Sequence, residues 1–367
     1  MPRTQVIYII RIKTRRGNLL NGQSLNMPYH QTVVNLATAK MDKVKIHSTY
    51  IRITAKRSNL SSAQSIIEDQ RNTLHIQIIK QTVLYYASNL TKAGIKEIKI
   101  ESYVGGQLHE SKRFSYKLEN EPLRNLHWRY QWNFATNDLI NYIKNDFESY
   151  GVILSHWLSG VSVDNTYTKF ENLWCCFERL SFKCYHGSNA HPRDKETLKA
   201  IRDFIRKHPI FFAKSCNFVH NMTDKDLREK FTWKLMIYND FKHGGRMESY
   251  NLYKDELVLP YQDSRVVKML RDTLVYREKD IQKHNSLYND ILSHLNHYMS
   301  QNICKDVDIL AILCGTFANY MRNKIFHGEL LCPSISLSYS FEDKIITSLN
   351  HILEIVDFEL IKCYSNL

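Results

Sequence analysis

The sequence predicts two domains of different class: an α+β domain over residues 1–135, followed by an all-helical bundle over residues 136–367. Segments in which apolar and polar residues alternate lie in the first part, and apolar residues at helical spacing dominate after about residue 137. The charge is divided in the same way. Residues 1–150 hold 22 Lys+Arg against 11 Asp+Glu, and residues 151–367 hold 28 against 26. With 367 residues, of which 43% are hydrophobic, the chain can fill two cores.

The first domain is predicted to contain strands around at least one helix. Apolar and polar side chains alternate in four segments that are therefore expected to be strands, at residues 4–13, 43–57, 95–100 and 113–118. Between them, apolar residues recur at three- and four-residue spacing over residues 63–88, where Ser61 or Ser62 can cap a helix.

The second domain is predicted to contain helices throughout. Their apolar stripes are separated by Gly, Pro or cappable starts, and the expected helices span residues 136–150, 166–185, 194–207, 224–242, 264–300, 305–327 and 341–364. The tract 264–300 has room for one break. The scarcity of Gly (12) and Pro (7) agrees with long helices.

Composition excludes several classes of protein. The eight cysteines form no CxxC pair, so neither a zinc site nor a disulfide framework is predicted, and no metal or cofactor is expected. The apolar run at residues 6–10 is interrupted by Arg11, and no stretch approaches the roughly 20 apolar residues of a membrane-spanning helix. We therefore expect a soluble cytoplasmic protein without a membrane partner.

The segment Arg322–Gly328 carries the residues best suited to chemistry. Arg322 is a permanent cation, Asn323 an amide, and His327 a group that titrates near neutral pH. Metal-free RNA cleavage needs such a general acid or base and a fixed positive charge for the phosphorane.

Helical geometry separates this segment into two faces. On one continuous helix, Leu310, Cys314, Phe317, Met321 and Ile325 fall within an arc of about 80° that is expected to face the core. Small polar residues form a stripe on the other side: Thr316, Asn319, Asn323 and His327. Such a stripe suits packing against another helix or subunit, and Gly328 is expected to end the helix just after His327.

An Arg–His spacing of this kind is not specific by itself. Three further pairs with similar spacing occur in the chain: Arg179/His186, Arg202/His208 and Arg277/His284. The pair Arg202/His208 lies in a helix rich in charged residues that is expected to be solvated. Only Arg322/His327 combines an Asn after the Arg, a Gly after the His, and a strongly apolar helix.

The segment RNxxxHG resembles the motif of nucleases in the HEPN superfamily. A second segment agrees, because Phe170, Leu173, Trp174, Glu178 and Leu180 are similar to the first-helix pattern F-x-x-L-W-x-x-x-E-x-L of many HEPN domains. The resemblance covers roughly residues 137–367 and leaves the basic α+β region unexplained.

The resemblance implies a metal-independent endoribonuclease that dimerises so that both chains contribute to one cleft. His327 would transfer protons while the ribose 2′-OH attacks, Arg322 would stabilise the phosphorane, and Asn323 would position phosphate or imidazole. Products would be a 2′,3′-cyclic phosphate and a 5′-OH end. Many such nucleases are toxins or act in anti-phage defence.

Three residues are candidates for a supporting role at this site, namely Glu178, Asn319 and Lys324. Glu178 could contact Arg322 or His327 from the neighbouring helix, or it could be an ordinary surface ion-pair residue. Lys324 could reach a phosphate or simply be solvated.

The basic first domain is predicted to bind RNA or to sense a regulatory protein or nucleic acid. Candidate RNA-binding residues form two groups, Arg11, Lys13, Arg15 and Arg16 near the N-terminus and Arg124, Trp128 and Arg129 near the domain boundary. The second group, in which cations alternate with aromatic residues, fits base stacking and a packed structural hinge equally well. Two alternatives to the nuclease remain: a non-catalytic HEPN-like scaffold and a DNA-binding regulator.

Overall fold

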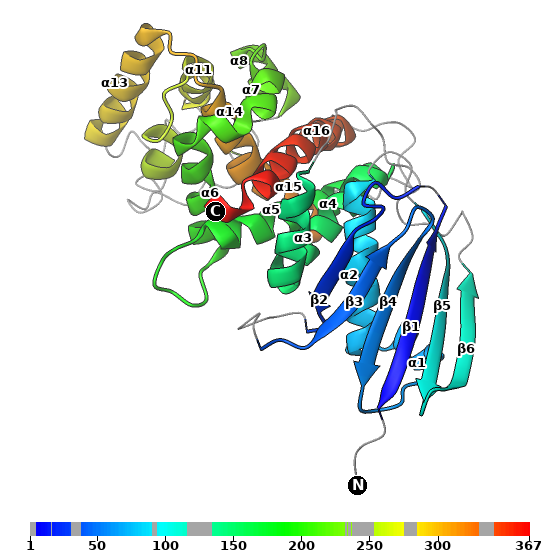
Figure 1. Ribbon diagram of the computed structural model, residues 1–367. Coiled ribbons are helices and arrows are strands. Elements are labelled where there is room, and N and C mark those ends of the chain that lie inside the picture. The colour runs from blue at the N-terminus through cyan, green and yellow to red at the C-terminus, as the bar shows by residue number, and fades with distance from the viewer. Residues whose placement is uncertain are drawn as a thin grey trace. The chain divides into compact units, whose positions relative to one another are not determined.

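An antiparallel sheet comes first in the chain and helices follow, which confirms the α+β and then helical order (Figure 1). The computed structural model describes residues 5–15, 17–30, 38–89, 94–115, 134–231, 233, 236, 253–274, 285–329 and 341–367. Packing divides the chain into two units, Met1–Asn165 and Thr166–Leu367.

The sheet of the first unit has six strands in the order β2-β3-β4-β1-β5-β6, and every neighbouring pair is antiparallel. The strands are β1 Val6–Thr14, β2 Ser24–Pro28, β3 Met41–Ile46, β4 Tyr50–Arg57, β5 Ile95–Val104 and β6 Gln107–Ser115. The first strand in sequence lies inside the sheet, because β1 pairs with β4 on one side and with β5 on the other.

One face of the sheet is covered by helices and holds the core of this unit. Along β1, Tyr8, Ile10 and Ile12 are fully buried, while the alternate residues are half-buried or exposed. Helix α1 (Ala63–Glu68) and helix α2 (Thr73–Ser88) supply the covering layer, and α2 lies behind the sheet in Figure 1.

Polar contacts attach α2 to the edge of the sheet. Buried Lys80 donates from Nζ to the carbonyls of Pro28 (2.8 Å) and His30 (2.6 Å), and its Nζ lies 5.5 Å from the centre of the Phe147 ring. Burial lowers the pKa of Lys80 to about 8, an effect that the negative charge of Asp42 opposes.

Several predicted elements of the first unit have different bounds. The expected strand 43–57 is a hairpin of β3 and β4, strand β2 was not predicted, and the expected strand 113–118 covers only the end of β6. The expected helix 63–88 is two helices, because the Asn72 side chain accepts a hydrogen bond from the Leu74 backbone N–H (2.9 Å) and starts α2 afresh.

The boundary between the units lies later than the predicted 135/136. Helix α3 (Thr136–Asn145), a π turn (Phe147–Gly151) and helix α4 (Val152–Ser162) all pack against α2 and so belong to the first unit. Their helical periodicity was predicted, but periodicity shows only that a helix has an apolar face and not which partner covers it.

The second unit is helical in all its described segments. Its helices are α5 Thr166–Cys184, α6 Asp194–Lys207, α7 Ala213–Val219, α8 Asp224–Lys230, α11 Ser264–Leu274, α13 Asn285–Gln301, α14 Asp306–Ile312, α15 Ala318–Phe326 and α16 Phe341–Lys362. The predictions for 166–185 and 194–207 are confirmed within a residue, and α7 was not predicted. Most of the predicted helix 224–242 beyond α8 lies outside the described residues.

Candidate functional site

The candidate site lies at the C-terminal end of a segment whose beginning is completely buried. Every residue of α14 from Val307 to Ile312 is buried, as expected for a helix that is mostly apolar on all sides. The predicted core residues Leu310, Cys314, Phe317 and Met321 are also buried, while Ile325 is half-buried. The core-facing arc is therefore confirmed except at its last member.

A π turn over Leu313–Phe317 interrupts the helix that was predicted to be continuous. A π turn contains one more residue than an α turn and so rotates the following residues about the axis. Of the predicted polar stripe, Thr316 falls inside this turn, whereas Asn319, Asn323 and His327 follow it on α15 or at its end.

Arg202 of α6 packs against the π turn at Gly315. Its Nη1 donates to the Gly315 carbonyl (3.1 Å), and a Cβ atom at Gly315 would lie 2.3 Å from the Arg202 Cγ. The guanidinium also pairs with Glu256 (3.2 Å). The expectation that Arg202 belongs to a solvated helix face was wrong, because only 8% of this residue is exposed.

Gly328 ends α15 as predicted and leaves His327 at the helix terminus. Gly328 has a φ of 67°, its N–H donates to the Ile325 carbonyl (3.2 Å), and the Glu329 N–H donates to the Lys324 carbonyl (2.9 Å). These two bonds form a Schellman motif, which glycine favours because it lacks a Cβ. The His327 side chain is exposed.

Arg322 is held by groups from two helices. Its Nη1 donates to the Asn323 Oδ1 (3.0 Å), its Nη2 lies 3.8 Å from the Glu178 Oε1, and its Cζ lies 5.2 Å from the centre of the Phe326 ring. Glu178 lies on α5, which packs against α15. The fold therefore brings together the two segments on which the family resemblance depends.

The buried face of α5 explains why Glu178 lies beside α15. Phe170, Leu173, Trp174, Phe177 and Leu180 are all buried, as the apolar spacing predicted. Glu178 is off this face, and 30% of its side chain is exposed, about the same fraction as that of Arg322 (29%). The pair is thus partly solvated, and its contribution to stability is small.

Cys175 is a neighbour of this pair that sequence reasoning did not single out. It is half-buried one turn before Glu178. Burial raises the pKa of the Cys175 thiol, the negative charges of Glu178 and Glu171 raise it further, and Arg179 and Arg322 oppose the change. The thiol is therefore neutral at pH 7. Its spacing from Glu178 on a predicted helix was the only signal that could have placed it here.

The other supporting residues lie on α15 without converging on His327. The Nζ of Lys324 lies 5.3 Å from the centre of the Tyr320 ring, and Asn319 is half-buried. On an α-helix, Asn323 and His327 are about 40° apart, whereas Arg322 and His327 are about 140° apart. On this geometry the two side chains of one chain leave the helix axis on different faces.

The predicted RNA-binding residues of the first unit are only partly described. Arg11 lies on β1 with 41% of its side chain exposed and lies 3.6 Å from Glu101, and Lys13 is exposed two residues later. Arg15 follows the strand, and its backbone N–H donates to the Gly94 carbonyl (2.8 Å). Four predicted residues lie outside the described part of the chain: Arg16, Arg124, Trp128 and Arg129.

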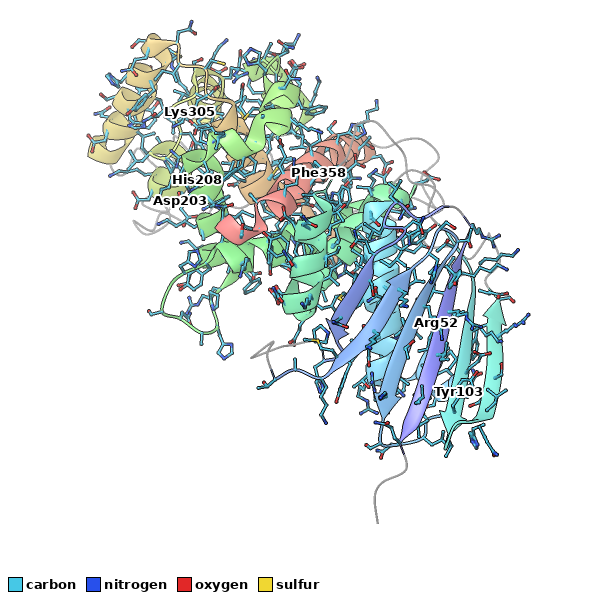
Figure 2. All side chains as sticks on the ribbon, in the orientation of Figure 1. Arg52, Tyr103, Asp203, His208, Lys305 and Phe358 are labelled. Carbon is cyan, nitrogen blue, oxygen red and sulfur yellow. The ribbon has the colours of Figure 1, made fainter. Side chains whose placement is uncertain are left out.

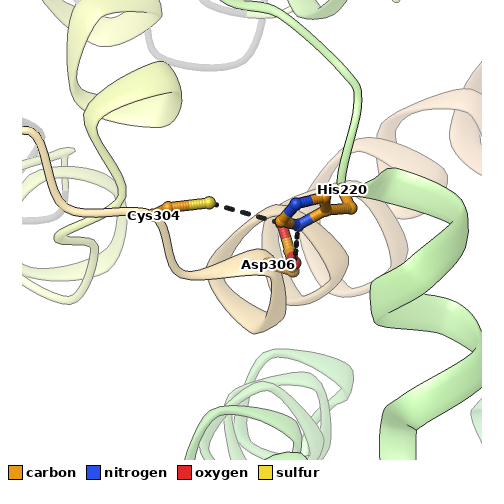
Figure 3. A group of neighbouring side chains, drawn as sticks. All are labelled: His220, Cys304 and Asp306. Carbon is orange, nitrogen blue, oxygen red and sulfur yellow. Dashed lines mark hydrogen bonds and ion pairs between the residues drawn. The ribbon is translucent and has the colours of Figure 1, made fainter.

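A second cluster of potential ligands lies elsewhere in the second unit. The Nδ1 of His220, the Sγ of Cys304 and a carboxylate oxygen of Asp306 all lie within 4.8 Å of one another (Figure 3). The sequence does not indicate this group, because its members come from separate segments without a recognisable spacing.

Arg265 supplies the positive charge in this cluster. Its Nη2 lies 2.6 Å from Asp306 and 3.4 Å from the Cys304 sulfur, and the His220 Nδ1 lies 2.8 Å from the other Asp306 oxygen. Both oxygens of Asp306 are thus engaged. A metal ion could bind here only if the guanidinium moved away, so these contacts favour a structural ion-pair network that joins α7, α11 and α14.

A pocket of about 300 Å³ lies in the first unit between α2 and α4. Its lining includes His75, Ile79, Phe147 and Ser155, and it contains none of the predicted site residues. The pocket therefore does not bear on the candidate site at Arg322 and His327.

No protein-family model matches the chain, and neither the curated proteins nor the solved structures include a detectable relative. Among the helices that the structure describes, none has the length and apolarity needed to span a membrane.

Proposed function

We propose that the protein is a metal-independent endoribonuclease of HEPN type whose second unit cleaves RNA as a dimer. The observation that carries the proposal is the ion pair between Arg322 and Glu178, together with the hydrogen bond from Arg322 to Asn323. Two segments that resemble the same family, far apart in the sequence, meet at a partly exposed cation, and an exposed histidine ends the helix that carries this cation.

The proposed reaction uses the ribose 2′-OH as the nucleophile. An imidazole of His327 accepts the 2′-OH proton while the 2′ oxygen bonds to phosphorus, and the bond from phosphorus to the 5′ oxygen breaks. The leaving 5′ oxygen takes up a proton from water, and the imidazolium returns its own proton to the solvent. A 2′,3′-cyclic phosphate and a 5′-OH end result, and DNA is not cleaved because it lacks the nucleophile.

The residues around His327 have roles that follow from their contacts. Arg322 stabilises the extra charge on the phosphorane, because a preformed cation strengthens its interaction as that charge develops. Asn323 and Glu178 hold the guanidinium on both sides, so they act as positioning residues. Asn319 and Lys324 have no described contact with Arg322 or His327 and are assigned to the surrounding surface.

Dimerisation is part of the proposal because Arg322 and His327 of one chain lie about 140° apart around an α-helix. A second copy would bring a guanidinium to the imidazole of the first and would cover the exposed Phe326, of which 54% is accessible. Anti-phage defence or toxicity, implied by the family resemblance, is the biological setting proposed for such an enzyme.

The experiment compares wild-type protein with His327→Ala on labelled RNA in EDTA. General acid–base catalysis typically contributes 10²–10⁴-fold, so the variant is expected to cleave at least about 100-fold more slowly. His208→Ala is the matched control: His208 is also exposed, also caps the end of a helix, and also follows an arginine at similar spacing.

Two results would contradict the proposal. If the wild type and His327→Ala both show the same negligible cleavage, the second unit is a non-catalytic scaffold. If EDTA abolishes cleavage by the wild type, a metal ion is required. The cyclic phosphate end, identified by mass spectrometry, separates this reaction from hydrolysis by a contaminating nuclease that leaves a 3′-OH.

A further inference from the structure

Five basic side chains form a continuous row across the sheet of the first unit. The strand register pairs Lys45 with Arg52, Arg52 with Arg11, Arg11 with Lys99, and Lys99 with Arg113. These residues come from β3, β4, β1, β5 and β6, so the cationic row, defined as these five residues, crosses five neighbouring strands. At about 4.8 Å between strands, it is about 19 Å long.

The cationic row lies on the face opposite α1 and α2. The buried residues of β1 point toward the helices, and Arg11 belongs to the alternate set. In Figure 2 the labelled Arg52 and Tyr103 lie on the side of the sheet turned toward the viewer, with α2 behind. At the two ends of the row, Lys45 and Arg113 are exposed.

Neighbouring positions on this face add more positive charge. Register and alternation place Lys13, Lys43 and Lys56 on the same side, against the acidic residues Glu97 and Glu101. The hydrogen bond from Lys99 and the charges of Lys99, Arg11 and Arg52 lower the pKa of Glu101, so this carboxylate is ionised and offsets one charge of the row. The row keeps a clear excess of cations.

Such a row is costly for the sheet alone. Like charges directly opposite each other on neighbouring strands are destabilising, and the row contains four such pairs. Only Glu101 pairs with members of the row among the described residues, at 3.6 Å from Arg11 and 2.5 Å from Lys99. A polyanion bound across the strands would remove this repulsion.

Aromatic side chains on the same face indicate which polyanion fits. Tyr50 lies two residues before Arg52 on β4 and pairs with Lys13 of β1. Its ring stacks on that of His47, with ring centres 4.2 Å apart. Tyr103 is half-exposed on the other side of the row. Unpaired bases stack on such rings while basic residues follow the phosphates.

We propose that the face of the sheet opposite α1 and α2 binds single-stranded RNA, with the phosphodiester backbone crossing the strands along Lys45, Arg52, Arg11, Lys99 and Arg113. The choice of RNA rests on the proposed function, whereas the site itself rests on register and charge. The first unit thus presents the strand that the second unit cuts.

Binding to the full-length protein tests this proposal without depending on cleavage. The probe is a fluorescent 2′-O-methyl oligouridine of about 12 nucleotides, which cannot undergo 2′-OH attack. For a single strand, log K falls with log salt by about 0.7 per phosphate contact, so Lys45→Ala/Arg113→Ala is expected to reduce that slope by about 1.4. Near 0.15 M salt, this corresponds to roughly tenfold weaker binding.

The control variant removes two cations of the same unit from other surfaces. Arg71 lies in the turn between α1 and α2, and Lys112, next to Arg113 on β6, points to the opposite face, where its Nζ donates to Gln64 (2.7 Å). Arg71→Ala/Lys112→Ala has the same net charge as the test variant and is expected to bind like the wild type.

Three results would overturn the proposal. The control variant could lose as much affinity for the oligouridine as the test variant. A duplex of the same length could bind the wild type as tightly as the single strand does. The test variant could keep its affinity for the oligouridine and lose only its binding to phosphatidylserine vesicles. If binding behaves as expected but His327→Ala leaves RNA cleavage unchanged, the binding face stands and the proposed nuclease fails.

Discussion

Asp357 lies on α16 in the core of the second unit, where neither carboxyl oxygen has a hydrogen-bond partner of good geometry among the described residues. The polar groups that face it are the thiols of Cys176 and Cys314. Burial raises the pKa of the Asp357 carboxyl well above its usual value, so the side chain remains protonated at a pH where an exposed Asp is ionised.

Asp357→Asn is expected to change how stability depends on pH. Because the folded pKa is raised, the stability associated with this group is fully present below the unfolded pKa of about 3.8 and decreases as pH rises toward the folded value, by about 1.4 kcal/mol per pH unit. Asparagine has no such titration. The free energy of unfolding is measured in urea from pH 4 to 8 for the wild type and for Asp357→Asn. The value for the variant minus the value for the wild type should therefore increase as pH rises.

A matched acid on the same helix serves as the control for that measurement. Glu342 lies in the first turn of α16 and is half-exposed, so Glu342→Gln removes a carboxyl from the same helix while leaving the buried surroundings of Asp357 unchanged. If the free energies of unfolding of the wild type and Asp357→Asn change with pH in parallel, the Asp357 carboxyl is ionised or solvated in the folded protein.

The residues that sequence analysis identified and missed differ in the range of their contacts. His327 and Gly328 were placed correctly at a helix end, because a Gly stop and an apolar periodicity are local signals. The surroundings of Arg202 and Cys175 were not predicted, because both depend on residues far away in the sequence. Arg202 is buried against Gly315, and Cys175 lies near Arg322. Contacts between distant segments leave no periodic pattern.

At the scale of elements, the helices of the second unit were easier to predict than the strands of the first. The apolar stripe of α5 and the charged start of α6 define these helices within a residue. The hairpin of β5 and β6 turns at Gly105 and Gly106, which both have positive φ (58° and 84°), a Gly-Gly signal that could have been recognised. Strand β2 has no clear alternation, and pairing with β3 determines it instead.

The π turn is the clearest case of structure that periodicity cannot predict. On a continuous helix, residues 305–327 give a consistent core face, so nothing local requires an extra residue in one turn. The close approach of the Arg202 side chain to Gly315 accompanies the irregularity. A glycine is needed there because a Cβ would overlap that side chain.

Gly315→Ala is therefore expected to destabilise the second unit by about 1–3 kcal/mol, the usual cost of overpacking a filled interior. Its Cβ would lie 2.3 Å from the Arg202 Cγ and 2.9 Å from its Cδ, so the guanidinium would have to leave its contacts with Gly315 and Glu256. The measurement is the free energy of unfolding in urea.

The control for this substitution is Gly17→Ala, since a Cβ there would meet only the Ser48 carbonyl at 4.0 Å. It should change stability by less than about 0.5 kcal/mol. If both variants lose the same free energy of unfolding, the cost at Gly315 comes from the different backbone preferences of glycine and alanine and not from the Arg202 contact.

At the scale of the whole molecule, binding and cleavage are assigned to different units. The excess of positive charge lies in residues 1–150, where the cationic row is, whereas residues 151–367 are nearly neutral and hold Arg322 and His327. A nearly neutral second unit can associate with a second copy without strong charge repulsion, and a basic first unit suits the binding of a polyanion such as the proposed RNA.

The dimer can be tested by combining two inactive proteins. Arg322→Ala keeps the imidazole and His327→Ala keeps the guanidinium, and each alone is expected to lose at least about 100-fold in cleavage rate. After the chains are unfolded together and refolded, about half of the dimers are mixed. A mixed dimer holds one Arg322 and one His327 on different chains, so the mixture should cleave at least about tenfold faster than either variant alone.

This result depends on the geometry of α15 and not only on dimer formation. Because Arg322 and His327 of one chain are about 140° apart on the helix, the arginine that serves a given histidine is expected to come from the other chain. If an affinity tag on one variant co-purifies the untagged other variant, so that mixed dimers form, but the mixture is no faster than its components, the site is complete within one chain. The Arg322–Glu178 pair would then hold the cation for the histidine of its own helix.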